Sequence, residues 1–268
     1  MTSPQFRIFS SLRFDPELPS AITAYGPARY PDPHDSPYYL LRYHRDRLLF
    51  AATEFEWPSA IDFLQRDLRH FTHTLDSSIP DRTKAWRLRV VVDSEGRCTV
   101  EVHPAAPCPA QTLFIPDSFK EHTSLSPSFP WSVYVDPQRT SSSLFTRHKT
   151  TARDMYTAAR ERVGIKTPQD PAEVLLVNTE GEVTEGSITT PYFRRRMSSS
   201  GHDVAGQWVT PALISGGNVG TTRRYALDHG FCTEQVIRED DLVDGEECWL
   251  SNGVRGFIPA IIVLQNPQ

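Results

Sequence analysis

The stretch Leu144-Phe145-Thr146-Arg147-His148-Lys149-Thr150-Thr151-Ala152-Arg153 decides how the rest of the chain is interpreted. Its lysine is one of four in the chain, the others being Lys84, Lys120 and Lys166. Lys149 stands among Arg147, His148 and Arg153, where we expect a helix to begin. Neighbouring cations and desolvation lower the pKa of an amine and make it a better nucleophile. On local evidence alone, an ordinary surface lysine at a helix start explains the stretch better.

A glycine-rich turn further along predicts an anion site. It runs Gly216-Gly217-Asn218-Val219-Gly220-Thr221-Thr222-Arg223 and opens a predicted helix. The first backbone N–H groups of a helix have no intrahelical partner, so this turn and the hydroxyls of Thr221 and Thr222 form a good phosphate cradle. The pattern is neither a Walker A loop nor a Rossmann fingerprint. A plain glycine turn with a threonine cap is the alternative.

Three other polar segments stand beside predicted strands and helices. They are Thr179–Ser187, which places Glu185 where a turn feeds a strand; His44–Leu48, which places Arg47 in the first turn of a helix; and Ser251–Gly256, a loop between two apolar strands. Charged residues are rarely buried, so each segment alone is better explained as solvated surface.

Composition limits the class of protein. The 268 residues carry 28 Lys and Arg against 33 Asp and Glu, for a net charge of −5, which argues against nucleic acid as the main partner. A mean hydropathy of −0.42 and the lack of an apolar run of ~18 residues argue against a membrane protein, and no secretory signal is visible. Four scattered cysteines predict free thiols, no metal site and a cytoplasmic protein.

Periodicity predicts an α+β protein with two domains. We expect a small domain over 1–104, a connection over 105–130 within a stretch that carries six prolines, and a larger domain over 131–268 that holds Lys149. The expected strands cover 6–14, 38–43, 86–92, 98–102, 131–136, 173–177, 186–193, 232–237, 247–250 and 257–263. The expected helices cover 44–55, a stretch from 59 through 71, 150–163 and 221–229, and residues 194–202 form a polar tip.

Taken in order, the segments resemble the class IV aminotransferase family. The motifs are His-x-x-Arg-Leu, His-Lys-Thr-Thr, Val-Thr-Glu-Gly-Ser, Gly-x-x-x-Gly-x-Thr-Arg and Ser-Asn-Gly-Val-Arg-Gly, and the likeness covers Phe9 to Pro259. These are the fold-type IV pyridoxal-phosphate enzymes, which include branched-chain and D-amino acid aminotransferases and aminodeoxychorismate lyases. The resemblance implies a two-domain enzyme with pyridoxal 5'-phosphate as cofactor, a small-molecule substrate and a homodimer.

The same resemblance assigns a role to each matching residue. Lys149 matches the lysine that holds the cofactor covalently, and Glu185 matches the carboxylate that faces its pyridine nitrogen. Arg47, Thr221, Thr222, Asn252 and Gly253 match cofactor-binding positions, the first three on the phosphate. The chain departs from the family at Gly253, where branched-chain enzymes carry a threonine, and at Thr190, where many members carry asparagine.

Within the family, the chain is most similar to the lyases. Arg153 lies four residues after the lysine, whereas Asp154 replaces the tyrosine that branched-chain enzymes place five after it. Phe9-Ser10-Ser11-Leu12-Arg13 is similar to a lyase strand with a catalytic hydroxyl, here Ser11, although the family's usual first strand and hairpin are expected to be missing. Arg13, Arg153 and Arg255 suit a substrate with two carboxylates.

The resemblance thus implies conversion of 4-amino-4-deoxychorismate to 4-aminobenzoate and pyruvate, a step of folate biosynthesis. One alternative is a transaminase on the same scaffold, acting on branched-chain, D-amino acid or amine substrates. The other is an inactive homologue that serves as a binding or assembly protein, because a fold alone does not fix a function.

Overall fold

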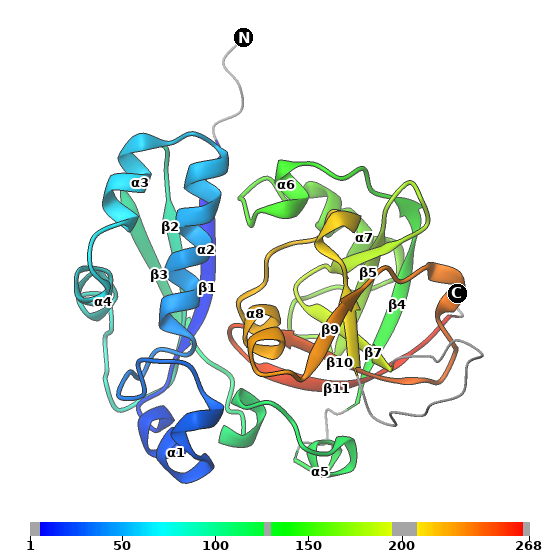
Figure 1. The fold of residues 1–268 in the computed structure, drawn as a ribbon, viewed down its shortest axis with the longest axis horizontal. Helices are drawn as coiled ribbons and strands as arrows, with labels where there is room; N and C mark the ends of the chain where they lie inside the picture. Colours follow the sequence, from blue (N-terminus) through cyan, green and yellow to red (C-terminus); the bar gives the residue numbers. More distant parts are fainter. Residues whose placement is uncertain (1–5, 126–129, 195–207, 265–268) are drawn as a thin grey trace. The chain divides into compact units, whose positions relative to one another are not determined.

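The computed structural model describes residues 6–125, 130–194 and 208–264, and most of the predicted polar tip over 194–202 lies outside them. The chain forms two compact units, shown in Figure 1. Unit 1 consists of Met1–Phe114, His148–Ala152 and Gly253–Arg255. Unit 2 consists of Ile115–Arg147, Arg153–Asn252 and Gly256–Gln268. Among the described residues, no helix is long and apolar enough to cross a membrane.

Unit 1 is a three-stranded antiparallel sheet with helices on one face (Figure 1). Its strands lie in the order β1 (Ile8–Phe14), β2 (Trp86–Val92) and β3 (Cys98–Pro104). Its helices are α1 (Leu18–Tyr25), α2 (Leu41–Glu54), α3 (Pro58–Leu64) and α4 (Leu68–Asp76), with short 3-10 turns η1 (Pro27–Arg29) and η2 (Ala110–Leu113). Alternate strand residues enter the core beneath α2, α3 and α4, as the period of two requires.

The two faces of β1 therefore differ. Ile8, Leu12 and Phe14 are buried in the core beneath the helices. Phe9, Ser11 and Arg13 belong to the opposite face, and Ser11 pairs in register with Arg89 of β2. One face of β1 thus serves packing, while the other carries polar residues.

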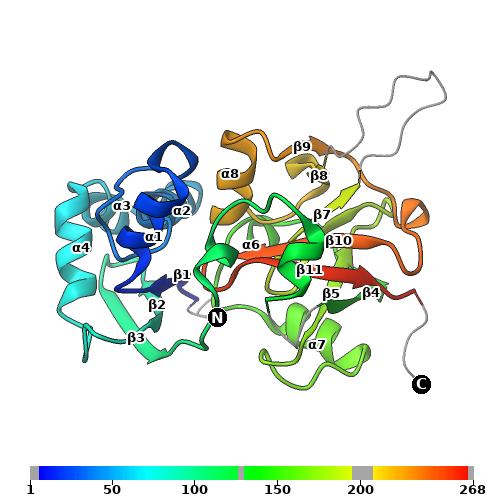
Figure 2. The ribbon, with the colours of Figure 1, turned by 90° about the horizontal axis from the view of Figure 1, so that it is seen from below.

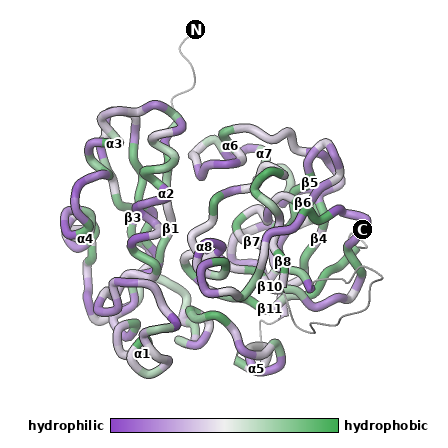
Figure 3. Tube along the Cα trace, viewed as in Figure 1, coloured by the Kyte–Doolittle hydropathy of each residue, from purple (hydrophilic) through white to green (hydrophobic). Residues whose placement is uncertain are grey.

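Unit 2 is built on a mixed eight-stranded sheet of order β6-β5-β4-β11-β10-β7-β8-β9. The strands are β4 (Trp131–Arg139), β5 (Ala172–Val177), β6 (Val183–Gly186), β7 (Thr190–Arg194), β8 (Trp208–Pro211), β9 (Cys232–Gln235), β10 (Glu247–Asn252) and β11 (Gly256–Ile262). β4 runs parallel to β5 and β11, and β8 runs parallel to β9. Most of β5 is coloured hydrophobic in Figure 3, as expected of a strand whose residues are nearly all buried.

Short helices flank this sheet. They are α5 (Phe119–Thr123), α6 (Leu144–Arg147), α7 (Asp154–Arg162) and α8 (Thr221–Asp228), with 3-10 turns η3 (Leu213–Ser215) and η4 (Glu239–Asp241). Figure 2 shows α7 beside β4 and β5, on which it packs through Ala159, together with Val163 directly after the helix. α8 contacts β9 and β10.

The α+β fold class is confirmed, but several predicted elements were wrong. No strand covers 38–43, because Leu40 takes a left-handed φ of 52° and α2 begins at Leu41. The helix expected from 59 through 71 is two helices, since Asp67 caps the start of α4 by accepting a hydrogen bond from the backbone N–H of His70.

Two further corrections concern the neighbourhood of Lys149 and Glu185. The helix expected over 150–163 begins only at Asp154, because Thr150 makes a strand-like bridge to Ile8. The strand expected over 186–193 is interrupted by a turn at 187–189, so Glu185 lies inside β6. Strand β8 was not predicted at all.

The assignment of residues to the two faces of β1 can be tested by substituting two adjacent residues. Leu12→Ala opens a cavity in the core of unit 1, and we expect it to lower the free energy of unfolding by about 2–5 kcal/mol. Ser11→Ala removes a hydroxyl from the polar face and should change stability by less than about 0.5 kcal/mol. Urea unfolding of both variants measures the difference. Equal losses would show that the assignment of the faces is incorrect.

Candidate active site

The predicted site residues fall into two groups, one in each unit. Unit 1 contains Ser11, Arg13, Arg47, Lys149, Gly253 and Arg255. Unit 2 contains Arg153, Glu185, Thr221, Thr222 and Asn252. Within each unit, the structure shows how these side chains are held.

The backbone around Lys149 is fixed along the outer edge of β1. The Phe9 N–H donates to the Lys149 carbonyl at 2.9 Å, and the Thr151 N–H donates to the Arg7 carbonyl at 2.8 Å. Next to the lysine, the buried His148 ring packs edge-on against Phe55, with centroids 5.5 Å apart. The lysine is therefore held by β1 and does not open a helix as predicted.

The Lys149 side chain lies over the polar face of β1. Its Nζ is 5.5 Å from the centroid of the Phe9 ring. Ser11 follows Phe9 by two residues and so shares its face of the strand. The structure thus brings the predicted covalent lysine and the predicted catalytic hydroxyl to one face of unit 1.

The half-buried Arg47 forms a polar cluster with the buried Ser10 and His44. An Arg47 guanidinium N–H donates to the Ser10 Oγ, and this Oγ is 2.6 Å from the Nδ1 of His44. Because Ser10 accepts from Arg47, its single proton is directed to Nδ1, so the neutral ring carries its own proton on Nε2. Burial lowers the pKa of His44 well below its usual value, and the positive charges of Arg47 and Lys149 lower it further.

His44 also explains why residue 253 is a glycine. A Cβ added at Gly253 would lie 2.4 Å from the His44 Cε1 and 2.8 Å from the Ser11 carbonyl oxygen. The Gly253 carbonyl accepts from the Arg13 N–H at 3.0 Å, which keeps the loop against β1. The threonine that branched-chain enzymes carry here would not fit beside this histidine.

Two of the predicted substrate arginines lie near Cys108. Arg13 is buried, and it donates to the Asp15 carboxylate at 2.8 Å and to the Ala106 carbonyl at 3.0 Å. Burial raises the pKa of the Cys108 thiol, while Arg13 and Arg255 oppose this effect through their charges. Arg13 therefore has a structural ion pair, and a contact with substrate stays a prediction for both arginines.

In unit 2, the Glu185 carboxylate has a close partner that the sequence did not reveal. The Tyr156 hydroxyl donates to the Glu185 Oε1 at 2.6 Å. The Arg153 guanidinium lies over the Tyr156 ring, 4.0 Å from its centroid, and donates to the Ser187 carbonyl at 2.5 Å. The one available signal was their spacing of three residues, with Arg153 at the N-cap of α7 and Tyr156 in its first turn, which places the two side chains on one side of the helix.

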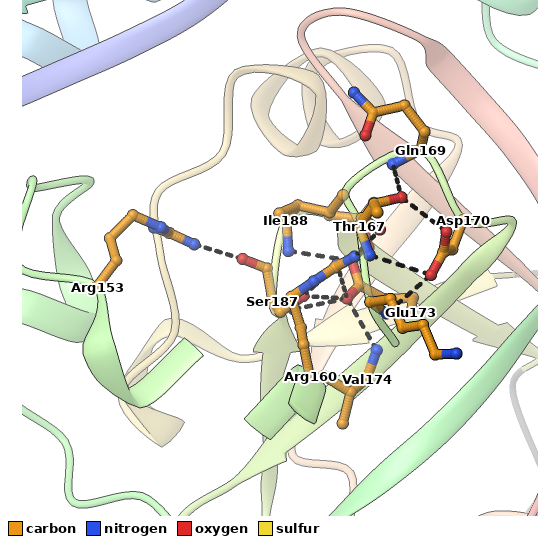
Figure 4. Close-up of polar contacts among 11 residues, drawn as sticks. Arg153, Arg160, Thr167, Gln169, Asp170, Glu173, Val174, Ser187 and Ile188 are labelled. Carbon is orange, nitrogen blue, oxygen red and sulfur yellow. Dashed lines mark hydrogen bonds and ion pairs between the residues drawn. The ribbon is translucent and has the colours of Figure 1, made fainter. Parts of the chain in front are cut away.

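Figure 4 shows the buried carboxylate that holds the turn after Glu185. Glu173 is fully buried and accepts hydrogen bonds from Ser187, Ile188 and Thr189, at 2.5 to 3.0 Å. Arg160 supports the turn by donating to the Ser187 Oγ at 3.1 Å. These contacts were not predicted, because they pair residues up to 27 positions apart.

The glycine-rich turn lies against Glu185. A Cβ at Gly217 would be 2.3 Å from the Thr184 carbonyl oxygen and 3.5 Å from the Glu185 Cβ, so only glycine allows this approach. α8 then starts at Thr221, with no side-chain cap from Gly220. In the first turn of α8, the Thr222 Oγ1 accepts a hydrogen bond from the Ser251 hydroxyl at 2.7 Å. The predicted anion cradle and the predicted carboxylate are therefore neighbours in unit 2.

The comparisons establish the family. The model of the family described as amino-transferase class IV matches residues 34–262, so the chain belongs to the class IV aminotransferases. It is 26% identical over 239 residues to the "Putative aminodeoxychorismate lyase" of Schizosaccharomyces pombe, covering 87% of each chain. It is 29% identical over 201 residues to the aminodeoxychorismate lyase of Saccharomyces cerevisiae, covering 67% of this chain and 52% of that protein.

A solved structure agrees on the fold. The "Putative amino-acid aminotransferase" of Mesorhizobium loti superposes with a TM-score of 0.68 at 24% identity, over 96% of this chain and all of that one. The predicted resemblance and the predicted fold-type IV architecture are thus confirmed.

The residues present fit pyridoxal phosphate, on which the family depends. The glycine turn offers backbone N–H groups at the start of α8, where a side chain at 217 or 220 would collide with the protein. Glu185, beside that turn, supplies a carboxylate, and unit 1 supplies the Lys149 amine. Among the described residues there is no cluster of three His, Cys, Asp or Glu side chains that would hold a metal ion.

The buried His44 makes stability depend on pH. Its lowered pKa means that the folded protein leaves it neutral, while the unfolded chain protonates it near pH 6.5. The contribution of neutral His44 to the free energy of unfolding is therefore fully present above pH 6.5. It falls by about 1.4 kcal/mol for each pH unit below that value. We expect His44→Gln to remove this part of the dependence when urea unfolding at pH 7.5 and 5.5 is compared.

The control for this measurement is His103→Gln, at an exposed position on β3. It should leave the difference between the two pH values as in the wild type. A His44→Gln variant with an unchanged pH dependence would contradict the assignment.

Proposed function

We propose that the protein is a pyridoxal-phosphate-dependent lyase that converts 4-amino-4-deoxychorismate to 4-aminobenzoate and pyruvate. The observation that carries the proposal is the placement of the Lys149 amine and Ser11 on one face of β1. Elimination needs a base for one proton and a donor for the leaving group, and these two side chains are suited to the two tasks. The names of both curated relatives support the same reaction.

Each residue has a defined task in this proposal. The cofactor, when bound, serves as the electron sink for the reaction. Lys149 would hold it covalently, and its amine, once displaced by the 4-amino group of the substrate, would remove the proton from C4 of the substrate. Ser11 delivers a proton to the departing enolpyruvate oxygen, and Arg255 binds a substrate carboxylate. Loss of the C4 proton and cleavage of the C3–O bond leave an aromatic ring, which makes the reaction favourable, and the released enolpyruvate tautomerises to pyruvate.

The other groups bind the cofactor. Arg47 and the start of α8, with Thr221 and Thr222, bind the phosphate, and Glu185 keeps the pyridine nitrogen protonated. Asn252 and Gly253 complete this part of the site. We assign the enzyme to folate synthesis in the cytoplasm as a homodimer. Its four free cysteines are consistent with a reducing compartment.

The covalent role of Lys149 can be mapped directly. Borohydride reduction of the protein loaded with pyridoxal phosphate should fix one equivalent on the peptide that contains Lys149. The other three lysines, Lys84, Lys120 and Lys166, serve as internal controls in the same digest. Lys149→Ala should abolish the label while the far-UV circular dichroism stays unchanged. Label on another lysine would refute the assignment.

The reaction itself is tested by supplying aminodeoxychorismate without any keto acid. We expect equal amounts of pyruvate and 4-aminobenzoate over many turnovers, and Ser11→Ala should lower kcat by 10-fold or more if proton delivery is its task. A transaminase would instead release no pyruvate and would exchange amino groups between an amino acid and a keto acid. A protein that takes up no cofactor would support an inactive homologue.

A further inference from the structure

We propose that Tyr156 is a positioning residue that orients Glu185 and keeps it ionised, and that Arg153 acts through Tyr156 rather than on the substrate. The role of Glu185 toward the pyridine nitrogen rests on the proposed function above. The contacts among the three residues lie wholly within unit 2.

The geometry fixes the direction of the hydrogen bond. An ionised carboxylate only accepts, so the Tyr156 hydroxyl donates to Oε1 across 2.6 Å, a short distance typical of a bond to a charged oxygen. The Tyr156 side chain is buried. Burial and the charge of Glu185 both raise the pKa of Tyr156 well above its usual value, so it remains a donor at any working pH.

Arg153 contacts the face of the Tyr156 ring. Its guanidinium stacks on the ring of Tyr156 and donates to the Ser187 carbonyl, so its plane is fixed by two contacts. Ser187 is itself fixed, because its hydroxyl and its N–H both donate to the buried Glu173, as Figure 4 shows. A continuous set of contacts therefore runs from Glu173 through Ser187, Arg153 and Tyr156 to Glu185.

This arrangement has a chemical consequence for Glu185. A hydrogen bond donated to the ionised form lowers the pKa of a carboxyl, and it limits rotation of the group. Removing the donor should therefore raise the pKa of Glu185 and let the carboxylate turn. A carboxylate that faces a pyridinium must stay ionised, so the loss should reduce cofactor binding and turnover more than substrate binding.

The test compares Tyr156→Phe with Tyr134→Phe, a matched loss of a hydroxyl from β4 of the same unit. The side-chain carboxyl of Glu185 is followed by carbon-13 NMR in the full-length chain without added cofactor, with Glu185→Gln to assign its signal. We expect the Glu185 pKa to rise by about one unit in Tyr156→Phe. Tyr134→Phe should leave it unchanged. An unchanged pKa in a folded Tyr156→Phe protein would overturn the proposal.

A second comparison separates the two roles of Arg153. Arg153→Lys keeps the charge but loses the planar stack, so it should raise the Glu185 pKa in the same direction and lower kcat with little change in KM. Combined with Tyr156→Phe, it should add no further shift, because both changes act through one hydrogen bond. A raised KM with an unchanged Glu185 pKa would show instead that Arg153 binds the substrate.

These measurements also separate this inference from the proposed function. The pKa of Glu185 is read in the protein alone, so it can shift as expected even if the lyase assay fails. Conversely, full lyase activity with no shift would leave the function in place and overturn the role of Tyr156. Binding of pyridoxal phosphate, followed by its visible absorbance, should weaken about 10-fold in Tyr156→Phe and stay normal in Tyr134→Phe.

Discussion

The outer edge of β1 is the feature on which unit 1 depends. Only one edge of this strand pairs with β2, and the other is covered by three short segments. Residues 149–151 bond to its beginning, Gly253 bonds to Arg13, and residues 37–39 bond to its end. Because an open strand edge carries unsatisfied backbone groups, these segments are required for the sheet itself. The same bonds hold Lys149, so the covalent lysine is positioned by main-chain geometry.

Unit 2 relies instead on a buried charge. Glu173 has no exposed surface, and such a carboxylate is stable only when its oxygens accept several hydrogen bonds. It obtains them from the turn at 187–189, which begins two residues after Glu185. The hydrogen bonds that the buried Glu173 carboxylate requires thus fix the turn next to the Glu185 carboxylate.

The sequence was most informative where local chemistry determines structure. The hairpin of β2 and β3 follows from Asp93-Ser94-Glu95-Gly96 between apolar runs, and the start of α8 follows from its glycines. The order of the motifs also identified the family and the candidate residues Lys149 and Glu185.

Contacts between distant residues could not be predicted in this way. Thr150 pairs with Ile8, so the segment around the lysine is not helical as its pattern predicted. The turn that donates hydrogen bonds to Glu173 interrupts the strand expected over 186–193. Tyr156 showed only as one residue of an amphipathic helix. The pattern suggested Met155, Ala158, Ala159 and Val163 as its apolar side. Ala159 and Val163 are buried as expected, but Tyr156 and Arg160 are buried in place of Met155 and Ala158. Hydrophobic periodicity does not show which polar side-chain groups will hydrogen-bond to residues far away in the sequence.

The covering of β1 by distant segments bears on how the chain is made. β1 leaves the ribosome before its two partner strands, and β3 ends about ninety residues after β1. The edge of β1 nevertheless lacks its partners at residues 149–151 and 253 until these later segments have been synthesised. At about 5–20 residues per second, this edge stays open for seconds and is exposed to other nascent chains. The sheet of unit 1 is therefore not complete when β1, β2 and β3 have been synthesised, because its open edge waits for the segments at 149–151 and 253.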